Sequence, residues 1–258
     1  MNASADTPVG SRTVLGIRVD ATDYDHAVEM ITNWSRVGEG RCVCVLTVHS
    51  VMEAYDAPAL NEIMNGSSLN TPDGMPLVWS LKALGVPHAT RVYGPELMAR
   101  LLARASGANV PLGFYGGHSD VALRHLVEVA EERFTGLDVA YAWSPPFRPL
   151  TEEEDERVCD EITASGARIL LVGLGCPKQE YWMAAHRSLP LVMIGVGAAF
   201  DFLAGLKPQA PTFIQKVGLE WLFRLIVEPR RLWKRYLKHN PRFVALIGEQ
   251  LLHLRSFD

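Results

Sequence analysis

Asp73 lies in the segment NTPDG at residues 70–74, where an acid stands between a proline and a glycine. Pro72 stiffens the chain on one side and Gly74 permits a bend on the other, so this loop can aim one carboxylate at a ligand. Alternatively, Asp73 caps a helix that begins at Met75, and the spacing by itself favours this cap. The local sequence therefore leaves the role of Asp73 open.

Two loops rich in small residues could hold a phosphate. One is GLGCPKQE at residues 173–180 and the other is GVGAAFD at residues 195–201, each directly after an apolar run. Pro177 suits the first turn of a helix whose free amides favour an anion, and Lys178 adds a positive charge. Asp201 could bind a sugar hydroxyl or cap the following turn. Two adjacent loops of this kind favour a nucleotide cleft more than either does alone.

Several other chemistries lose their main support. Asp23-Tyr24-Asp25 resembles a metal-binding DxD signature, but it opens a predicted helix, so we expect helix capping there. The sequence has no HExxH, GxSxG or Walker A motif, which argues against zinc proteolysis, α/β-hydrolase chemistry and P-loop phosphotransfer. The four cysteines form no CxxC, so neither a disulfide scaffold nor structural zinc is expected.

The elements that must position these loops alternate along the chain. Thr151 and Glu154 form a predicted capping box at the start of one helix. Strands are predicted at residues 14–19, 42–48, 110–115, 137–143, 168–174 and 191–196, and helices at 24–36, 51–64, 75–84, 95–105, 121–134, 152–164 and 179–187. This alternation predicts an α/β fold of the Rossmann-like type, with a mostly parallel sheet flanked by helices. Ligands of such sheets sit at the carboxyl ends of the strands, where Thr47 and His49 also lie.

The length of 258 residues fits one α/β domain with an appendage. We expect a loose tail over residues 1–13, without signal peptide or N-terminal anchor, and a catalytic domain over residues 14–206. The most apolar stretch, residues 189–206, contains Asp201 and three glycines and falls short of a bilayer span. These features predict a cytoplasmic protein without a transmembrane helix.

The remaining residues, 207–258, form a basic helical appendage. From Gly205 onward there are ten Lys or Arg against four Asp or Glu, a net charge of +6 that leaves −10 on the body. The basic residues Arg224, Arg230, Arg231, Lys234 and Arg235 alternate with aromatic residues, as at membrane surfaces. The acidic body and a pI near 6.1 argue against nucleic acid. Prolines 208, 211, 229 and 241 are expected to divide the appendage into about three helices, and the apolar face of the last helix docks on the body or on another subunit, which allows a homo-oligomer.

Six strings together resemble one family. They are TPDGMPLVW, RVYGPEL, SPPF, VGLGCPKQEYW, GVGAAFDFLAG and GLEWLFRLIVEPRRLWKRY. In order and spacing, from about Val14 to Tyr236, the chain resembles the WecG/TagA/CpsF glycosyltransferases of bacterial cell-envelope polysaccharide assembly.

The resemblance implies an inverting, metal-independent hexosyltransferase that needs no cofactor. It implies a UDP-sugar donor and a polyprenyl-pyrophosphate-linked acceptor at the inner face of the cytoplasmic membrane, where the protein is peripheral. Asp73 matches the family's proposed base. The appendage arginines match a part said to reach the membrane and close the active site. Its first-strand threonine matches Thr47, and its GxPxQE segment matches Gly175, Pro177, Gln179 and Glu180. Together with the residues that the loops themselves suggest, the predicted substrate contacts are Thr47, His49, Gly74, Gly175, Pro177, Lys178, Gln179, Glu180, Gly197 and Asp201.

Two positions depart from the family pattern, which usually has Asn where His49 stands and Arg where Gln209 stands. A noncatalytic membrane-surface protein that binds a UDP-sugar or acts as a scaffold is the alternative to a transferase.

Overall fold

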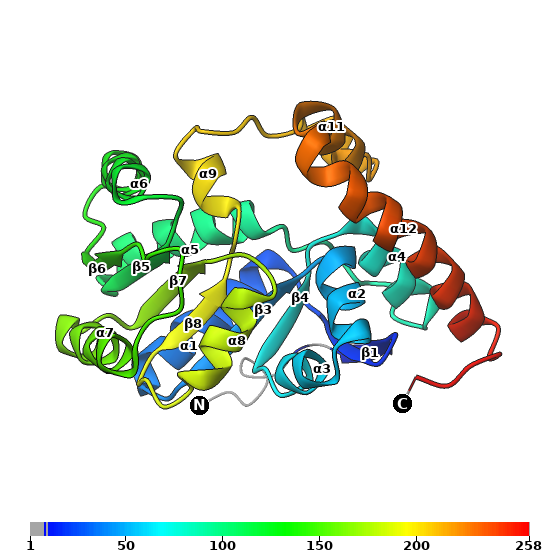
Figure 1. The fold of residues 1–258 in the computed structure, drawn as a ribbon, viewed down its shortest axis with the longest axis horizontal. Helices are drawn as coiled ribbons and strands as arrows, with labels where there is room; N and C mark the ends of the chain where they lie inside the picture. Colours follow the sequence, from blue (N-terminus) through cyan, green and yellow to red (C-terminus); the bar gives the residue numbers. More distant parts are fainter. Residues whose placement is uncertain (1–7, 9, 258) are drawn as a thin grey trace.

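The computed structural model describes residue 8 and residues 10–257. Its main sheet has the strand order β4-β3-β8-β7-β5-β6 and every pairing is parallel (Figure 1). The strands are β3 (Arg41–Leu46), β4 (Leu69–Pro72), β5 (Leu112–Gly116), β6 (Val139–Trp143), β7 (Ile169–Gly173) and β8 (Val192–Gly195). The predicted Rossmann-like α/β fold class is confirmed.

Alternate residues of the strands pack into two cores, one on each face of the sheet. In β3, Val43 and Val45 join one core while Cys42 and Cys44 join the other, as the two-residue period of a strand requires. Four helices contribute to the first core: α1 (Tyr24–Val37), α5 (Gly94–Ala108), α6 (Asp120–Arg133) and α9 (Ala199–Leu203). Six contribute to the second: α2 (Val48–Asp56), α3 (Pro58–Asn65), α4 (Met75–Ala83), α7 (Glu152–Ser165), α8 (Lys178–Ala185) and, through Phe243, α12 (Pro229–Leu251).

The N-terminal segment differs from the prediction. Residues 10–13, expected in the loose tail, belong to β1 (Gly10–Val14), which pairs antiparallel with β2 (Ile17–Ala21). Leu15 and Gly16 between them have φ values of 52° and 83°, as in the tight turns that match strand twist. The predicted strand at 14–19 is thus wrong, because one apolar run spans a turn. Residues 1–7 and 9 of the predicted tail lie outside the described residues.

Two predicted helix caps are confirmed, whereas one helix and one strand differ from the prediction. Asp23 accepts a hydrogen bond from the amide of His26 and so caps α1, and Thr151 forms its capping box with Glu154. The predicted helix at 51–64 is two helices, because Pro58 starts α3. Strand β4 was not predicted, since its sequence LNTP has a single large apolar residue.

The appendage consists of α10 (Thr212–Lys216), α11 (Glu220–Val227) and α12 (Pro229–Leu251). Figure 1 shows it as an arm at one end of the sheet, with α12 running beside α2. Pro241 lies inside α12 and does not end it, contrary to the prediction. Packing compensates for the lost backbone bond, because Phe243 is buried with Leu246 and Ile247 in the second core. No helix of the described residues is long and apolar enough to cross a membrane.

We expect Asn70→Ala to destabilise the fold by about 1–3 kcal/mol, because it removes a buried hydrogen bond together with the side-chain atoms that pack around it. Asn70 is fully buried in β4 and its amide donates to the carbonyl of Met64 at 2.8 Å. The measurement is urea unfolding, with Asn240→Ala on α12 as the matched control, expected to change stability by less than about 0.5 kcal/mol. Equal stability of the two variants would contradict the prediction.

Candidate active site at the carboxyl ends of the strands

A cavity of about 980 Å³ lies where the parallel strands end. Loops after β3, β4, β5, β7 and β8 contribute to its wall, and α11 and α12 contribute basic side chains from the appendage. The predicted residues that line it are Thr47, His49, Asp73, Gly175, Lys178, Gln179, Gly197, Asp201, Arg224, Arg231 and Arg235. Tertiary structure therefore gathers most of the predicted site around one hollow.

Five predicted residues do not line this cavity. Gly74 is the N-cap of α4 and Pro177 the N-cap of α8, so both serve backbone geometry. Glu180 is only 1% exposed and accepts a hydrogen bond from Gln179, which turns its carboxylate into the protein. Arg230 and Lys234 are exposed on α12 and point away from the cavity wall. The cavity wall therefore does not include these five residues; the substrate contacts of Gly74, Pro177 and Glu180, and the acceptor or membrane contacts of Arg230 and Lys234, stay predictions.

Asp73 is held by an arginine and does not cap α4. Arg91 Nη2 donates to Asp73 Oδ1 at 3.0 Å, and its Nε donates to the Asp73 carbonyl. The amide of Gly94 donates to Oδ2 at 3.3 Å. Helix α4 has Gly74 as its N-cap without a side-chain bond, so the capping interpretation is wrong. The carboxylate keeps 14% of its side-chain surface exposed, at the cavity wall.

The appendage reaches the same arginine. Arg91 Nη2 also donates to Glu220 Oε2 at 2.6 Å, and Glu220 begins α11. Arg224 Nε lies 3.6 Å from the other oxygen of Glu220. Burial raises the pKa of Asp73, Arg91 lowers it, and the negative charge of Glu220 raises it again. The pKa of Asp73 therefore depends on where the appendage places Glu220.

The loop after β3 is anchored by a cap. Thr47 accepts a hydrogen bond from the amide of Ser50 at 3.3 Å and caps α2, so its side chain is fixed beside the cavity. His49 follows on the first turn of α2. Burial and the nearby Arg235 lower the pKa of His49 to about 3, so its imidazole is neutral at physiological pH.

The two glycine loops touch each other through Gln179. Its Oε1 accepts from the amide of Gly175 at 3.1 Å, and a side chain at Gly195 would collide with its Nε2 at 2.8 Å. Gly197 has φ +50°, a left-handed conformation that favours glycine. These contacts fix the two loops side by side, as expected of a cleft for a phosphorylated ligand.

Asp201 is buried beside a lysine and a histidine. Lys207 Nζ lies 2.6 Å from its Oδ2, and His118 Nε2 lies 3.1 Å from the carboxylate. Asp201 thus ties the loop after β8 to the start of the appendage. Lys178 lines the cavity and forms no ion pair with another described residue, so its charge faces the hollow.

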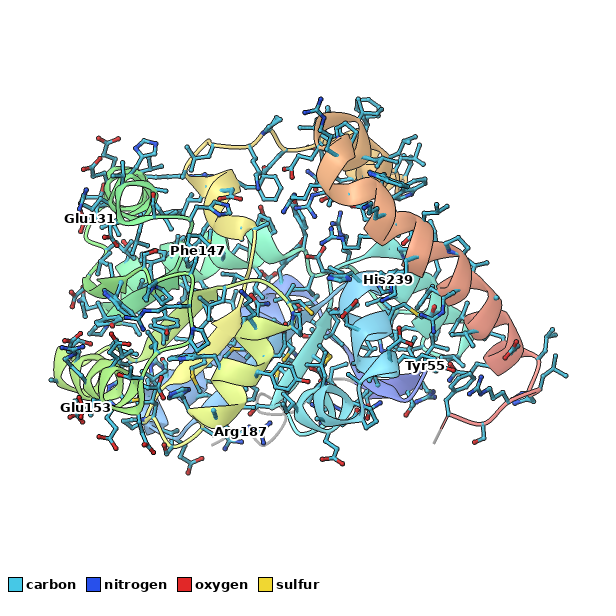
Figure 2. All side chains as sticks on the ribbon, viewed as in Figure 1. Tyr55, Glu131, Phe147, Glu153, Arg187 and His239 are labelled. Atoms are coloured by element: carbon cyan, nitrogen blue, oxygen red, sulfur yellow. The ribbon has the colours of Figure 1, made fainter. Side chains whose placement is uncertain are left out.

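Several residues at or behind the cavity wall were not predicted from the sequence. Arg91, which holds Asp73 but does not itself line the cavity, is the chief one, and the signal was its place in RVYGPEL, one of the strings that carry the family resemblance. Stacked Tyr115 and Trp182, 4.1 Å apart, form another part of the wall. Phe147, labelled in Figure 2, is 84% exposed on the loop between β6 and α7. These aromatic side chains line the same cavity as Asp73, although they are distant from it in the sequence.

Residues 12–256 match the model of the glycosyl transferase WecG/TagA/CpsF family. The chain belongs to this family. It is also 30% identical over 197 residues to an N-acetylglucosaminyldiphosphoundecaprenol N-acetyl-beta-D-mannosaminyltransferase of Bacillus spizizenii, an alignment that covers 76% of this chain and 74% of that protein. The family resemblance predicted from the sequence is therefore confirmed.

Two clusters among the described residues have the side chains to hold a metal ion. One joins His49, Glu53 and His239, and the other joins Asp155, Cys159 and His186. Neither cluster contains Asp73.

We expect Arg91→Gln to raise the pKa of Asp73 and Glu220→Gln to lower it. The first variant removes a positive charge that favours the carboxylate, and the second removes a negative charge that opposes it. Carbon-13 NMR titration of labelled aspartate carboxyls measures both shifts. Glu131→Gln on the exposed surface of α6 is the control and should leave the titration unchanged. Shifts of the opposite sign would contradict the coupling.

Proposed function

We propose that this protein is an inverting hexosyltransferase that moves a sugar from a UDP-sugar to a saccharide linked to polyprenyl pyrophosphate. One observation carries the proposal: in a chain of this glycosyltransferase family, the Asp73 carboxylate faces a 980 Å³ cavity that also receives cationic side chains. The relative from Bacillus spizizenii, whose name describes transfer to a diphosphoundecaprenol-linked sugar, supports the acceptor class.

Asp73 acts as general base in the proposed reaction. Its carboxylate takes the proton of the acceptor hydroxyl as that oxygen attacks the anomeric carbon from the face opposite UDP, so the anomeric configuration inverts. Arg91 and the amide of Gly94 hold both carboxylate oxygens. Burial raises the pKa of Asp73, which strengthens its carboxylate as a base.

Departing UDP develops negative charge on its β-phosphate. Lys178, Arg224, Arg231 and Arg235 line the cavity and are the proposed partners of that charge. Three of these four residues come from the appendage. The appendage therefore completes the electrostatic site in this proposal.

The outer face of α12 is proposed to rest on the inner face of the cytoplasmic membrane, where the lipid-linked acceptor resides. Helical spacing places Arg230, Trp233, Lys234 and Leu237 on one side of α12, opposite the buried His239. Trp233 and Leu237 are 48% and 68% exposed. Mixed basic and apolar side chains on one exposed face are typical of helices at an anionic lipid surface.

A noncatalytic UDP-sugar-binding or scaffold protein would use the same cavity and the same helix face. One measurement distinguishes the two functions, because only a transferase releases UDP when donor and acceptor are both present. The ionisable Asp73 at the cavity wall favours the transferase.

We expect Asp73→Asn to reduce turnover by about 10²- to 10⁴-fold, the range over which a general base contributes. Release of UDP from a panel of UDP-hexoses, with a short lipid-diphosphate saccharide as acceptor, measures turnover. Asp160→Asn on the exposed side of α7 is the matched control and should retain full activity. Turnover of folded Asp73→Asn within a few-fold of the unmodified protein would contradict its role as base.

We expect Arg230→Gln with Lys234→Gln to weaken binding to vesicles containing phosphatidylglycerol by about 30-fold, since each cation contributes about 1 kcal/mol near an anionic surface. Co-sedimentation measures the affinity. The double control Arg104→Gln with Arg124→Gln removes two exposed cations from α5 and α6 and should bind as before. Equal losses in both double variants would show that net charge alone, and not the α12 face, directs binding.

A further inference from the structure

Three potential metal ligands meet in the seam between α2 and α12. His49 and Glu53 are one helical turn apart on α2, and His239 approaches from α12; their donor atoms all lie within 4.8 Å of one another. His239 Nε2 is 3.1 Å from Glu53 Oε1, and His49 Nδ1 is 3.9 Å from the same oxygen. Two ligands of a tetrahedral zinc ion are about 3.3 Å apart, so these separations bracket the required value.

The histidine nitrogens in this seam lack hydrogen-bond partners. Nδ1 of His49 and Nδ1 of His239 are both buried and neither has a partner among the described residues. The His239 side chain is 3% exposed, and in Figure 2 it lies between α12 and α2. Buried polar atoms are almost always satisfied in folded proteins, so the unpaired Nδ1 of His49, beside a carboxylate that the Nε2 of His239 also approaches, points to a ligand. The atom of His49 that lacks a partner is the one that faces Glu53.

The donor set selects the class of ion. Two neutral imidazoles with one carboxylate suit zinc, cobalt and nickel, whereas magnesium and calcium prefer oxygen ligands throughout. Because His49 also lines the large cavity, a fourth coordination position is available to water on that side.

Nearby positive charges repel a metal ion, and the strength of this repulsion depends on where the charges lie. Lys238 Nζ lies 3.8 Å from Glu53 Oε1, but its side chain is 57% exposed and Asp56 offers an alternative partner at 4.0 Å. Arg242 is already paired with Asp56 through two bonds of 2.8 Å. Lys238 can therefore leave Glu53 at small cost, and Glu53 is then free for the ion.

We propose that His49, Glu53 and His239 bind a divalent transition metal of the zinc class, which clasps α12 to α2. This site lies apart from Asp73 and its function does not depend on sugar transfer. The ion adds a bond between the appendage and the body at His239, which is one of the three buried residues of α12 together with Leu232 and Phe243. Binding would therefore stabilise the arm that carries the cavity arginines.

The test is titration of tag-free, full-length protein with Co²⁺, followed by its visible d–d absorption, and with Zn²⁺, followed by calorimetry. We expect one ion per chain, and an affinity lowered about tenfold or more in Glu53→Gln and in His239→Gln. Zn²⁺ should raise the Tm of the unmodified protein and leave that of either variant unchanged. Excess Mg²⁺ should not displace Co²⁺.

Matched variants separate this site from others. Cys159→Ser removes a ligand of the second cluster and should bind Co²⁺ as the unmodified protein does, and so should His125→Gln on exposed α6. Lys238→Ala should tighten binding, because it removes the competing ammonium group. If His239→Gln does not fold, the Glu53→Gln variant alone tests the site, because Glu53 is more exposed and its replacement disturbs the fold less. No absorption with Co²⁺, or binding lost in Cys159→Ser and kept in Glu53→Gln, overturns the proposal.

Discussion

The arrangement of the site depends on one guanidinium group. Burying the Asp73 carboxylate at a cavity wall is costly unless a cation accompanies it, and Arg91 is that cation. The same Nη2 atom also serves Glu220, so two carboxylates from different parts of the chain share one positive charge. This shared charge links the loop after β4 to the first residue of α11. The position of Glu220 therefore influences the electrostatic environment of Asp73 through Arg91.

The parallel sheet explains why the remaining groups converge. All six strands of the main sheet end on the same side, so residues from β3, β4, β7 and β8 reach one hollow although more than a hundred residues separate them in sequence. Packing on both faces leaves the strand ends as the natural place for a ligand. The glycines of the β7 and β8 loops then let Gln179 fasten those loops together.

The appendage has two faces with different physical tasks. Its inner face buries Leu232, His239 and Phe243 against the body, and its outer face presents basic and aromatic side chains. The inward arginines at 224, 231 and 235 reach the cavity between these two faces. In the proposed function, one helix pair thus meets the lipid surface and supplies charge to the site. Both the membrane contact and the supply of charge to the cavity depend on the packing of His239 between α12 and the body.

Local sequence determined the fold class, five of the six main-sheet strands, the caps at Asp23 and Thr151, and the two glycine loops, because each is encoded by residues close together in the chain. Tertiary structure alone decided the rest. Strand β4 is polar in sequence, yet Asn70 and Thr71 are fully buried by their neighbours. Pro241 is kept inside a helix by packing. Arg91 finds Asp73 across 18 residues and Glu220 across 129, and no local pattern encodes a pairing that depends on strand order.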